Sequence, residues 1–231
     1  MFENLIAEIA GFLFWLINLL INRTLRFQIV NEEIIDKVHG QGKQIVFASW
    51  HAEFFPAIYY YRNKKLCLLP ITSIRGKILT ALGKRFGYQI IPYPEFGTPG
   101  ERIQSAQRML KIIREGHDMA LVVDGPPKPA YHKVNPGVLF FSQKTGNPLI
   151  PVGIYMKRKF TMFWRWDKYE IPLPGSTVVI ALGEPFEVPA ELDVIELGEK
   201  TKELEEKLNR AGGIAKQALN RMVQGQALQL H

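Results

Sequence analysis

The sequence predicts an α/β protein with a largely parallel or mixed central sheet flanked by helices, preceded by an apolar N-terminal helix. Three observations support this fold class. From residue 43 onward, short apolar runs alternate with longer segments of helical spacing, as in β-α-β units. The runs at 44–49 and 119–123 are almost continuously apolar, which is typical of parallel strands buried on both faces. Residues 5–21 form a separate apolar stretch.

The individual elements follow from the spacing of apolar residues. Strands are expected at 44–49, 65–71, 88–92, 119–123, 149–154 and 176–182. Helices are expected at 53–62, 77–86, 99–115, 137–145 and 191–223. The helix at 99–115 has the clearest apolar stripe, and Gly116 follows it, as glycine often follows a helix. Gly212-Gly213 is expected to break the last helix.

The N-terminal stretch predicts a membrane-associating helical segment over residues 1–42, followed by an α/β domain with C-terminal helices over 43–231. The apolar run is close to the ~20 residues needed to span a bilayer. Trp15 and the trailing Arg23 and Arg26 suit a segment at the membrane interface, whether it spans or lies on the surface. If it spans, the arginines place the domain on the cytoplasmic face of the inner membrane. A buried core helix of a soluble protein is the alternative.

The charge balance limits the class of partner. The 231 residues include 29 basic and 22 acidic ones, a net charge of +7, which favours an anionic partner such as lipid, nucleic acid or an acidic metabolite. The basic residues are scattered rather than interleaved with aromatics, which argues against nucleic acid. Cys67 is the single cysteine, so no disulfide forms within the chain, and the five histidines show no zinc-binding pattern.

Polar residues that directly follow predicted strands are the candidate site residues, because parallel sheets bind ligands at the carboxyl ends of their strands. Trp50, His51 and Glu53 follow the first strand, and a neutral imidazole there can take a proton from an attacking hydroxyl. A packing or capping histidine is the alternative. Asp124 and Gly125 follow the 119–123 strand, where the acid could orient His51, ligate a cation or cap a turn.

A third segment after a strand predicts an anion site. Ser73, Arg75 and Lys77 lie where the 65–71 strand gives way to a helix. Backbone N–H groups at a helix start, together with basic side chains, can hold a phosphate.

Together these segments occur in an ordered set. Trp-His follows the first strand, Ser-x-Arg-Gly the second, and Asp-Gly-Pro-x-x-Pro a later one; Gly-x-Pro-x-x-Pro-Val and Trp166-Asp167 come afterwards. The set resembles the lysophospholipid acyltransferase superfamily over residues 43–189. It is most similar to an uncharacterised bacterial branch with Trp-His and Asp-Gly-Pro motifs, related to glycerolipid and lipid A acyltransferases.

The resemblance implies an O-acyltransferase of lipid metabolism. A fatty acyl group would pass from acyl-CoA or acyl-carrier protein to a hydroxyl of a lysophospholipid or related lipid, with His51 as general base. Arg75, Lys77 and Lys128 would hold substrate phosphate, with Trp50, Ser73, Gly125 and Pro126 lining the same site. No cofactor or metal is implied.

One departure from the family pattern decides the expected partner of His51. Glycerolipid acyltransferases have an Asp five residues after the His, and this sequence has Pro56 there. Glu53 lies two residues from His51, a spacing that does not place side chains on one helix face. We therefore expect Asp124 to pair with the imidazole. The missing acid also leaves open a non-catalytic lipid- or acyl-carrier-binding protein on the same fold.

Overall fold

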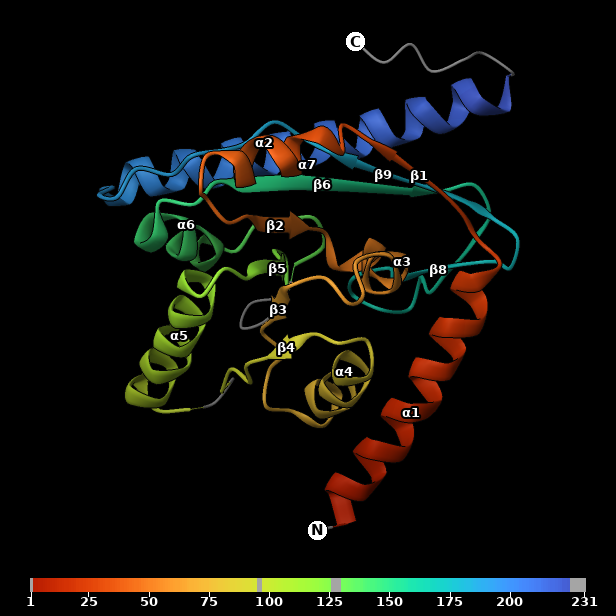
Figure 1. The fold of residues 1–231 in the computed structure, drawn as a ribbon, viewed down its shortest axis with the longest axis horizontal. Helices are drawn as coiled ribbons and strands as arrows, with labels where there is room; N and C mark the ends of the chain where they lie inside the picture. Colours follow the sequence, from red (N-terminus) through yellow and green to blue (C-terminus); the bar gives the residue numbers. More distant parts are fainter. Residues whose placement is uncertain (1, 95–96, 126–129, 225–231) are drawn as a thin grey trace.

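The computed structural model describes residues 2–94, 97–125 and 130–224. Its centre is a seven-stranded sheet (Figure 1). Across the sheet the strands are β1 (Arg26–Val30), β9 (Thr177–Leu182), β6 (Leu149–Met156), β2 (Val46–Ser49), β5 (Asp118–Val122), β3 (Leu66–Leu68) and β4 (Gln89–Ile90). The five strands from β6 to β4 are parallel, and β9 pairs antiparallel with β6. The expected fold class is therefore confirmed.

Helices cover both faces of this sheet. They are α1 (Phe2–Arg23), α2 (Glu33–Gly40), η1 (His51–Glu53), α3 (Phe54–Tyr60), α4 (Ile74–Arg85), α5 (Pro99–Arg114), η2 (Pro136–Val138), α6 (Leu139–Thr145) and α7 (Val194–Val223). The side chains of β2 show why helices pack on both faces of the sheet. Val46 and Ala48 belong to the core cluster shared with α5, α6 and α7, whereas Phe47 belongs to the cluster shared with α2, α3 and α4. Alternate side chains of one strand thus fill two cores.

Part of the first 42 residues belongs to the same sheet and core as the rest of the described chain. β1 pairs parallel with β9 at the edge of the central sheet. Ile34 and Val38 of α2 are buried in the main core. The sequence pattern missed β1 because its five residues, RFQIV, begin with an exposed arginine.

The long C-terminal helix also differs from expectation, because α7 passes through Gly212-Gly213 without a break. Two glycines each cost a helix about 1 kcal/mol relative to alanine. Packing outweighs that cost, since Leu204, Leu208 and Ala215 of α7 are fully buried. The contact with the sheet is close: a Cβ on Gly153 of β6 would lie 2.1 Å from the backbone N of Gly212.

Helix α1 lies along the protein rather than projecting from it (Figure 1). Ala7 and Gly11 face α4, where a Cβ on Gly11 would come within 2.4 Å of the Cβ of Ala81. Two ion pairs cross the same contact, Lys77 with Glu3 at 3.3 Å and Arg85 with Glu8 at 3.1 Å. Further along, Asn18 is buried and donates to the carbonyl oxygen of Phe55 in α3.

The opposite face of α1 is apolar and exposed. Its residues are Leu5, Ile6, Ile9, Phe12, Leu13, Ile17 and Leu20, each between 43% and 57% exposed. By length and composition the helix at Glu3–Arg23 could cross a membrane, a test that core helices and signal sequences also pass. The structure thus gives α1 one packed face and one apolar face without a partner in the described chain.

Two short strands form a hairpin outside the central sheet. β7 (Lys159–Thr161) pairs antiparallel with β8 (Glu170–Pro172), and residues 162–169 connect them. The amide of Met162 donates to the carbonyl of Tyr169 at 2.9 Å, which closes the connection into a compact loop. The sequence pattern did not predict this hairpin, although it carries side chains that reach the site.

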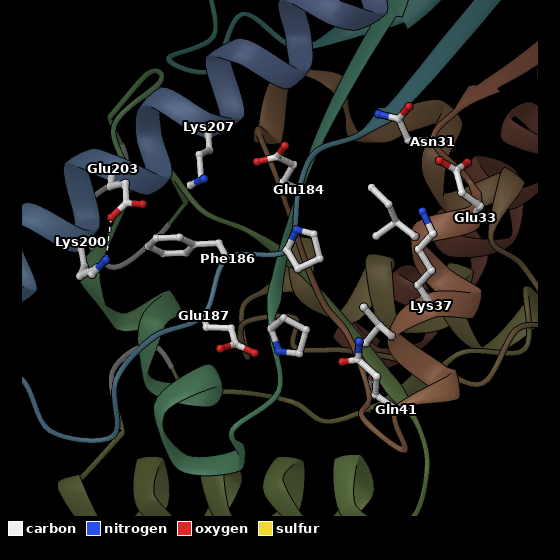
Figure 2. A pocket seen from close by; sticks show the side chains of 14 residues that line it. Asn31, Glu33, Lys37, Gln41, Glu184, Phe186, Glu187, Lys200, Glu203 and Lys207 are labelled. Carbon is white, nitrogen blue, oxygen red and sulfur yellow. Dashed lines mark hydrogen bonds and ion pairs between the residues drawn. The ribbon is translucent and has the colours of Figure 1, made fainter. Parts of the chain in front are cut away.

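The amino edge of the sheet carries a cavity of about 710 Å³ (Figure 2). α2, the segment after β9, and α7 surround it, and its charged lining includes Lys37, Glu184 and Lys207. Pro148, at the start of β6, also lines it. His51 follows the opposite, carboxyl end of the neighbouring strand β2, so this cavity is remote from the predicted site.

Candidate active site

His51 lies where the sequence places it, at the carboxyl edge in the middle of the sheet. β2 ends at Ser49, Trp50 remains extended, and His51 opens the short helix η1 that leads into α3. Its side chain is 28% exposed. Pro56, at the position where glycerolipid acyltransferases have an acid, lies in the first turn of α3, where a missing N–H is tolerated.

The carboxylate that pairs with the imidazole is Asp167. Its Oδ2 lies 2.6 Å from Nδ1 of His51, and its side chain is completely buried. An ionised carboxylate at this position accepts a hydrogen bond from Nδ1–H, so the proton stays on Nδ1 and the lone pair is on Nε2. Nε2 of His51 has no hydrogen-bond partner within the described ranges of the chain, so it is free to act as a base.

Arg165 holds Asp167 in place with two hydrogen bonds. Its Nε donates to Oδ1 at 2.8 Å and its Nη2 to Oδ2 at 2.7 Å, the fork geometry that guanidinium and carboxylate groups favour. Burial raises the pKa of Asp167, but the hydrogen bonds from Arg165 and His51 and the positive charge of Arg165 outweigh it. The net result is a pKa below the usual value, so Asp167 is ionised.

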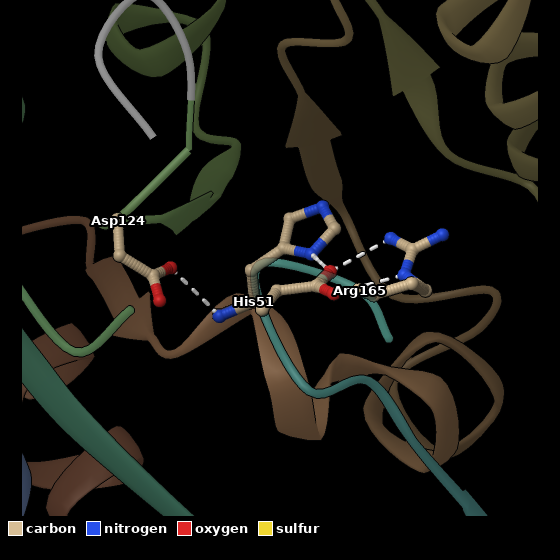
Figure 3. A network of polar contacts seen from close by, with 4 residues as sticks. His51, Asp124 and Arg165 are labelled. Atoms are coloured by element: carbon tan, nitrogen blue, oxygen red, sulfur yellow. Dashed lines mark hydrogen bonds and ion pairs between the residues drawn. The ribbon is translucent and has the colours of Figure 1, made fainter. Parts of the chain in front are cut away.

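The expected pairing of Asp124 with the imidazole is therefore wrong. Asp124 is completely buried, and its Oδ1 accepts the backbone N–H of His51 at 2.9 Å (Figure 3). Desolvation raises its pKa, while the amides of His51 and neighbouring residues lower it, and the balance is a raised value. Asp124 thus fixes the main chain of His51 rather than its ring. Gly125 is buried beside it, and Pro126 and Lys128 lie outside the described residues.

Glu53 does not face the imidazole either. Its Oε2 accepts the backbone N–H of Ile154 in β6 at 3.0 Å. Although part of its surface is accessible, the carboxyl is surrounded by protein atoms, and this desolvation raises its pKa to about 8. Glu53 is therefore protonated at neutral pH and ties η1 to the sheet. Its catalytic role stays a prediction.

Aromatic rings surround His51. Trp166 and Tyr169, from the loop that carries Asp167, have ring centroids 5.4 Å and 5.8 Å from the imidazole. Trp50 is only 1% exposed and stacks on His132 at 4.6 Å, so its predicted contact with substrate is replaced by a packing role. Burial first, and then Lys168, lower the pKa of His132, which favours its neutral form.

The Ser-x-Arg-Gly segment opens a helix as predicted. Ser73 caps α4, with its Oγ accepting the N–H of Gly76 at 3.3 Å. Gly76 is required there, since a Cβ would lie 1.6 Å from the carbonyl oxygen of Ile71. Arg75 is exposed at the same edge of the sheet as His51. Lys77 pairs with Glu3 of α1 at 3.3 Å, and its place in the anion site stays a prediction.

Comparison with known proteins gives one relative that decides the family. No family model matches the chain. Uncharacterized protein RP090 of Rickettsia prowazekii (strain Madrid E) is 30% identical over an alignment of 171 residues that covers 72% of this chain and 75% of that protein. The chain belongs to the RP090 family. Because the name RP090 carries no activity, the function of this family must be inferred from the geometry of the site.

Sequence reasoning missed Asp167 and Arg165 as site residues. The signal was present, because Trp166-Asp167 is one of the motifs that carry the family resemblance. What the sequence lacks is any indication that the loop at 162–169 folds back to residue 51, 116 positions earlier. Within the described residues no group of three or more His, Cys, Asp or Glu side chains could hold a metal ion.

Proposed function

We propose that the chain is an O-acyltransferase that works at a membrane surface. It would move a fatty acyl group from acyl-CoA or acyl-carrier protein to a hydroxyl of a lysophospholipid or related lipid acceptor. The observation that carries the proposal is the 2.6 Å contact between Nδ1 of His51 and the buried Asp167, which leaves Nε2 as the base. The motif order of the lysophospholipid acyltransferase superfamily gives the substrate class.

The geometry supports a direct transfer. The acceptor hydroxyl oxygen attacks the thioester carbonyl carbon while Nε2 of His51 takes its proton. The resulting imidazolium is stabilised by Asp167, which Arg165 keeps ionised. The tetrahedral intermediate then expels the thiolate, which takes the proton back from Nε2. The products are the acylated lipid and a free thiol, and His51 returns to its starting state.

The missing acid at Pro56 no longer argues against catalysis. Asp167 reaches the imidazole from a loop outside the main sheet and supplies the carboxylate that the family pattern places one helical turn after the histidine. Arg75, exposed at the same sheet edge, is the described cation best placed to hold a substrate phosphate.

The apolar face of α1 supports a lipid surface as the working environment. A helix that spanned the bilayer in this arrangement would carry Arg85 of α4 into the hydrocarbon, because Arg85 pairs with Glu8, more than one turn inside the candidate span. Charges at that depth are costly. A helix lying in the interface buries only its apolar face. We therefore place α1 in the surface plane of the membrane, with the cytoplasmic face of the inner membrane as the proposed side.

Purified full-length protein with acyl-CoA or acyl-carrier protein and a panel of lysolipids tests the activity, with products followed by mass spectrometry. His51→Ala should lower the rate by about 10²–10⁴-fold. His39→Ala is the matched control, because His39 also pairs with an acid, Asp118, at 3.0 Å. Equal turnover by His51→Ala and the parent would refute the proposal. Binding without turnover in the parent would favour a lipid- or carrier-binding protein.

The membrane claim has its own test. Ile9→Lys with Leu13→Lys places charges on the exposed face of α1, where these residues are 53% and 51% exposed, and should release the protein from membranes. Val194→Lys with Ile195→Lys, at 86% and 73% exposed on α7, is the control and should stay bound. Equal retention of both variants would contradict a lipid contact through α1.

A further inference from the structure

The β7–β8 hairpin carries an exposed apolar surface that the proposed chemistry does not use. Phe163 and Trp164, in its connecting loop, are 77% and 74% exposed. Phe160 and Ile171 are cross-strand partners and so share a face of the hairpin. Leu173, 43% exposed, follows on the same face by alternation. The rings of Phe160 and Trp164 are 5.9 Å apart, so the apolar side chains form one surface.

The charges around this surface are mostly positive. Residues 156–176 contain five basic and two acidic side chains. Both acids are neutralised within the hairpin, Asp167 by Arg165 at 2.7 Å and Glu170 by Lys159 at 2.6 Å. Lys157 and Arg158 are exposed at the start of the hairpin and form no ion pair with any described residue. The hairpin therefore presents aromatic rings beside uncompensated cations.

We propose that this hairpin is a second lipid-contacting element and docks on a bilayer that contains anionic phospholipid. Tryptophan and phenylalanine favour the membrane interface, and nearby lysine and arginine are attracted to anionic headgroups. The segment that follows the hairpin also contacts the end of α1, since the amide of Gly175 donates to Oγ1 of Thr24 at 2.9 Å. The occupant is thus a lipid surface shared with α1.

The placement links lipid contact to His51. Arg165 and Asp167 belong to the same closed loop as Phe163 and Trp164. A hairpin seated in the headgroup layer would hold His51, whose side chain is 28% exposed, near the lipid surface through its contact with Asp167. The docking itself needs no acyl transfer, so binding and turnover can be tested separately.

A thiol-linked fluorophore on Phe163→Cys reports directly on this contact in the full-length protein. Cys67 is completely buried, so the label attaches to the new cysteine. On phosphatidylcholine vesicles that contain phosphatidylglycerol, the emission should shift to shorter wavelength and be quenched by spin-labelled lipid. The matched control is Val194→Cys, 86% exposed at the start of α7, at the other end of the molecule from β8 (Figure 1). Its label should remain in water.

Further measurements distinguish a lipid surface from a second copy of the chain as the partner of the hairpin. Lys157→Gln with Arg158→Gln should weaken binding to anionic vesicles by about tenfold or more, since each cation near the surface contributes about 1 kcal/mol. A label at 163 that stays in water on vesicle-bound protein overturns the proposal. A blue shift that needs no vesicles and grows with protein concentration also overturns it, because it assigns the surface to a second copy. Insertion of the label without any acyl transfer would leave the docking intact and reject the proposed function.

Discussion

Nδ1 of His51 and Oδ2 of Asp167 lie 2.6 Å apart, although 116 positions separate the two residues in the chain. The contact joins the carboxyl edge of the central sheet to a hairpin that lies outside it. It decides which ring nitrogen carries the proton, and Arg165 decides that the acid is charged. The orientation of the His51 ring therefore depends on a segment that lies outside the central sheet.

Asp167→Asn should lower the acyl transfer rate by about 10²–10⁴-fold, because the amide can donate to Nδ1 and stabilise the tautomer with its proton on Nε2. Asp118→Asn is the matched control, since Asp118 pairs with His39 at the amino edge. Steady-state rates for the two variants, with circular dichroism to establish folding, measure the effect. Equal rates would show that Asp167 does not orient the base.

Two substitutions of Asp124 should distinguish a role in holding the main chain of His51 from a role in catalysis. Asp124→Asn keeps an oxygen that can accept the N–H of His51, so activity should stay within a few-fold of the parent. Asp124→Ala leaves that buried donor unpaired and should lower the free energy of unfolding by about 1–3 kcal/mol. Urea denaturation and rate measurements on both variants check this. A loss in Asp124→Asn as large as in Asp167→Asn would contradict the assignment.

Substitutions of Arg75 and Lys77 should have different effects on KM, although the two residues are only two positions apart. If Arg75 holds a substrate phosphate, Arg75→Ala removes a charged hydrogen bond worth about 1.5–3 kcal/mol and raises KM by about tenfold or more. Lys77→Ala removes only an exposed pair with Glu3, worth about 0–1 kcal/mol of stability, and should leave KM unchanged. Initial rates against donor and acceptor concentration distinguish them. A larger KM effect at Lys77 would move the phosphate site.

Glu53 should make stability fall as pH rises. Its pKa is about 8 in the folded protein and 4.5 in the reference state, so the folded state binds the extra proton between these values. Stability from this group is present below about pH 4.5 and is lost as pH rises to about 8. Glu53→Gln removes the dependence and should be more stable than the parent at pH 9 by on the order of 2–4 kcal/mol. Thermal unfolding of both proteins from pH 5 to 9 measures it, and parallel curves would refute it.

The sequence predicted the strands and helices that have a clear local pattern of apolar residues. The buried strands around Val46 and Leu149 and the helix ended by Gly116 are predicted by apolar spacing, and strand ends then locate His51. β1 and the β7–β8 hairpin have mixed composition and lacked such a signal. Asp167 could not be assigned because its role arises only when a remote loop closes on the sheet edge.

The error at Gly212 has a different physical origin. Local propensity favours a break there, but a tertiary contact decides the outcome, because the α7 backbone lies against Gly153. The choice of Asp124 over Asp167 failed for a similar reason. Asp124 does reach residue 51 from the neighbouring strand, as parallel pairing predicts, but it meets the backbone N–H rather than the ring.

The crossing of Gly11 and Ala81 has a consequence for exchanging parts between members of the RP090 family. α1 is matched to α4 by a close contact that tolerates no extra side-chain atom, and by two ion pairs at set positions along both helices. A chimera that receives α1 alone from a relative should therefore fold poorly unless α4 is transplanted with it. α1 and α4 therefore have to be exchanged together, although fifty residues of chain separate them.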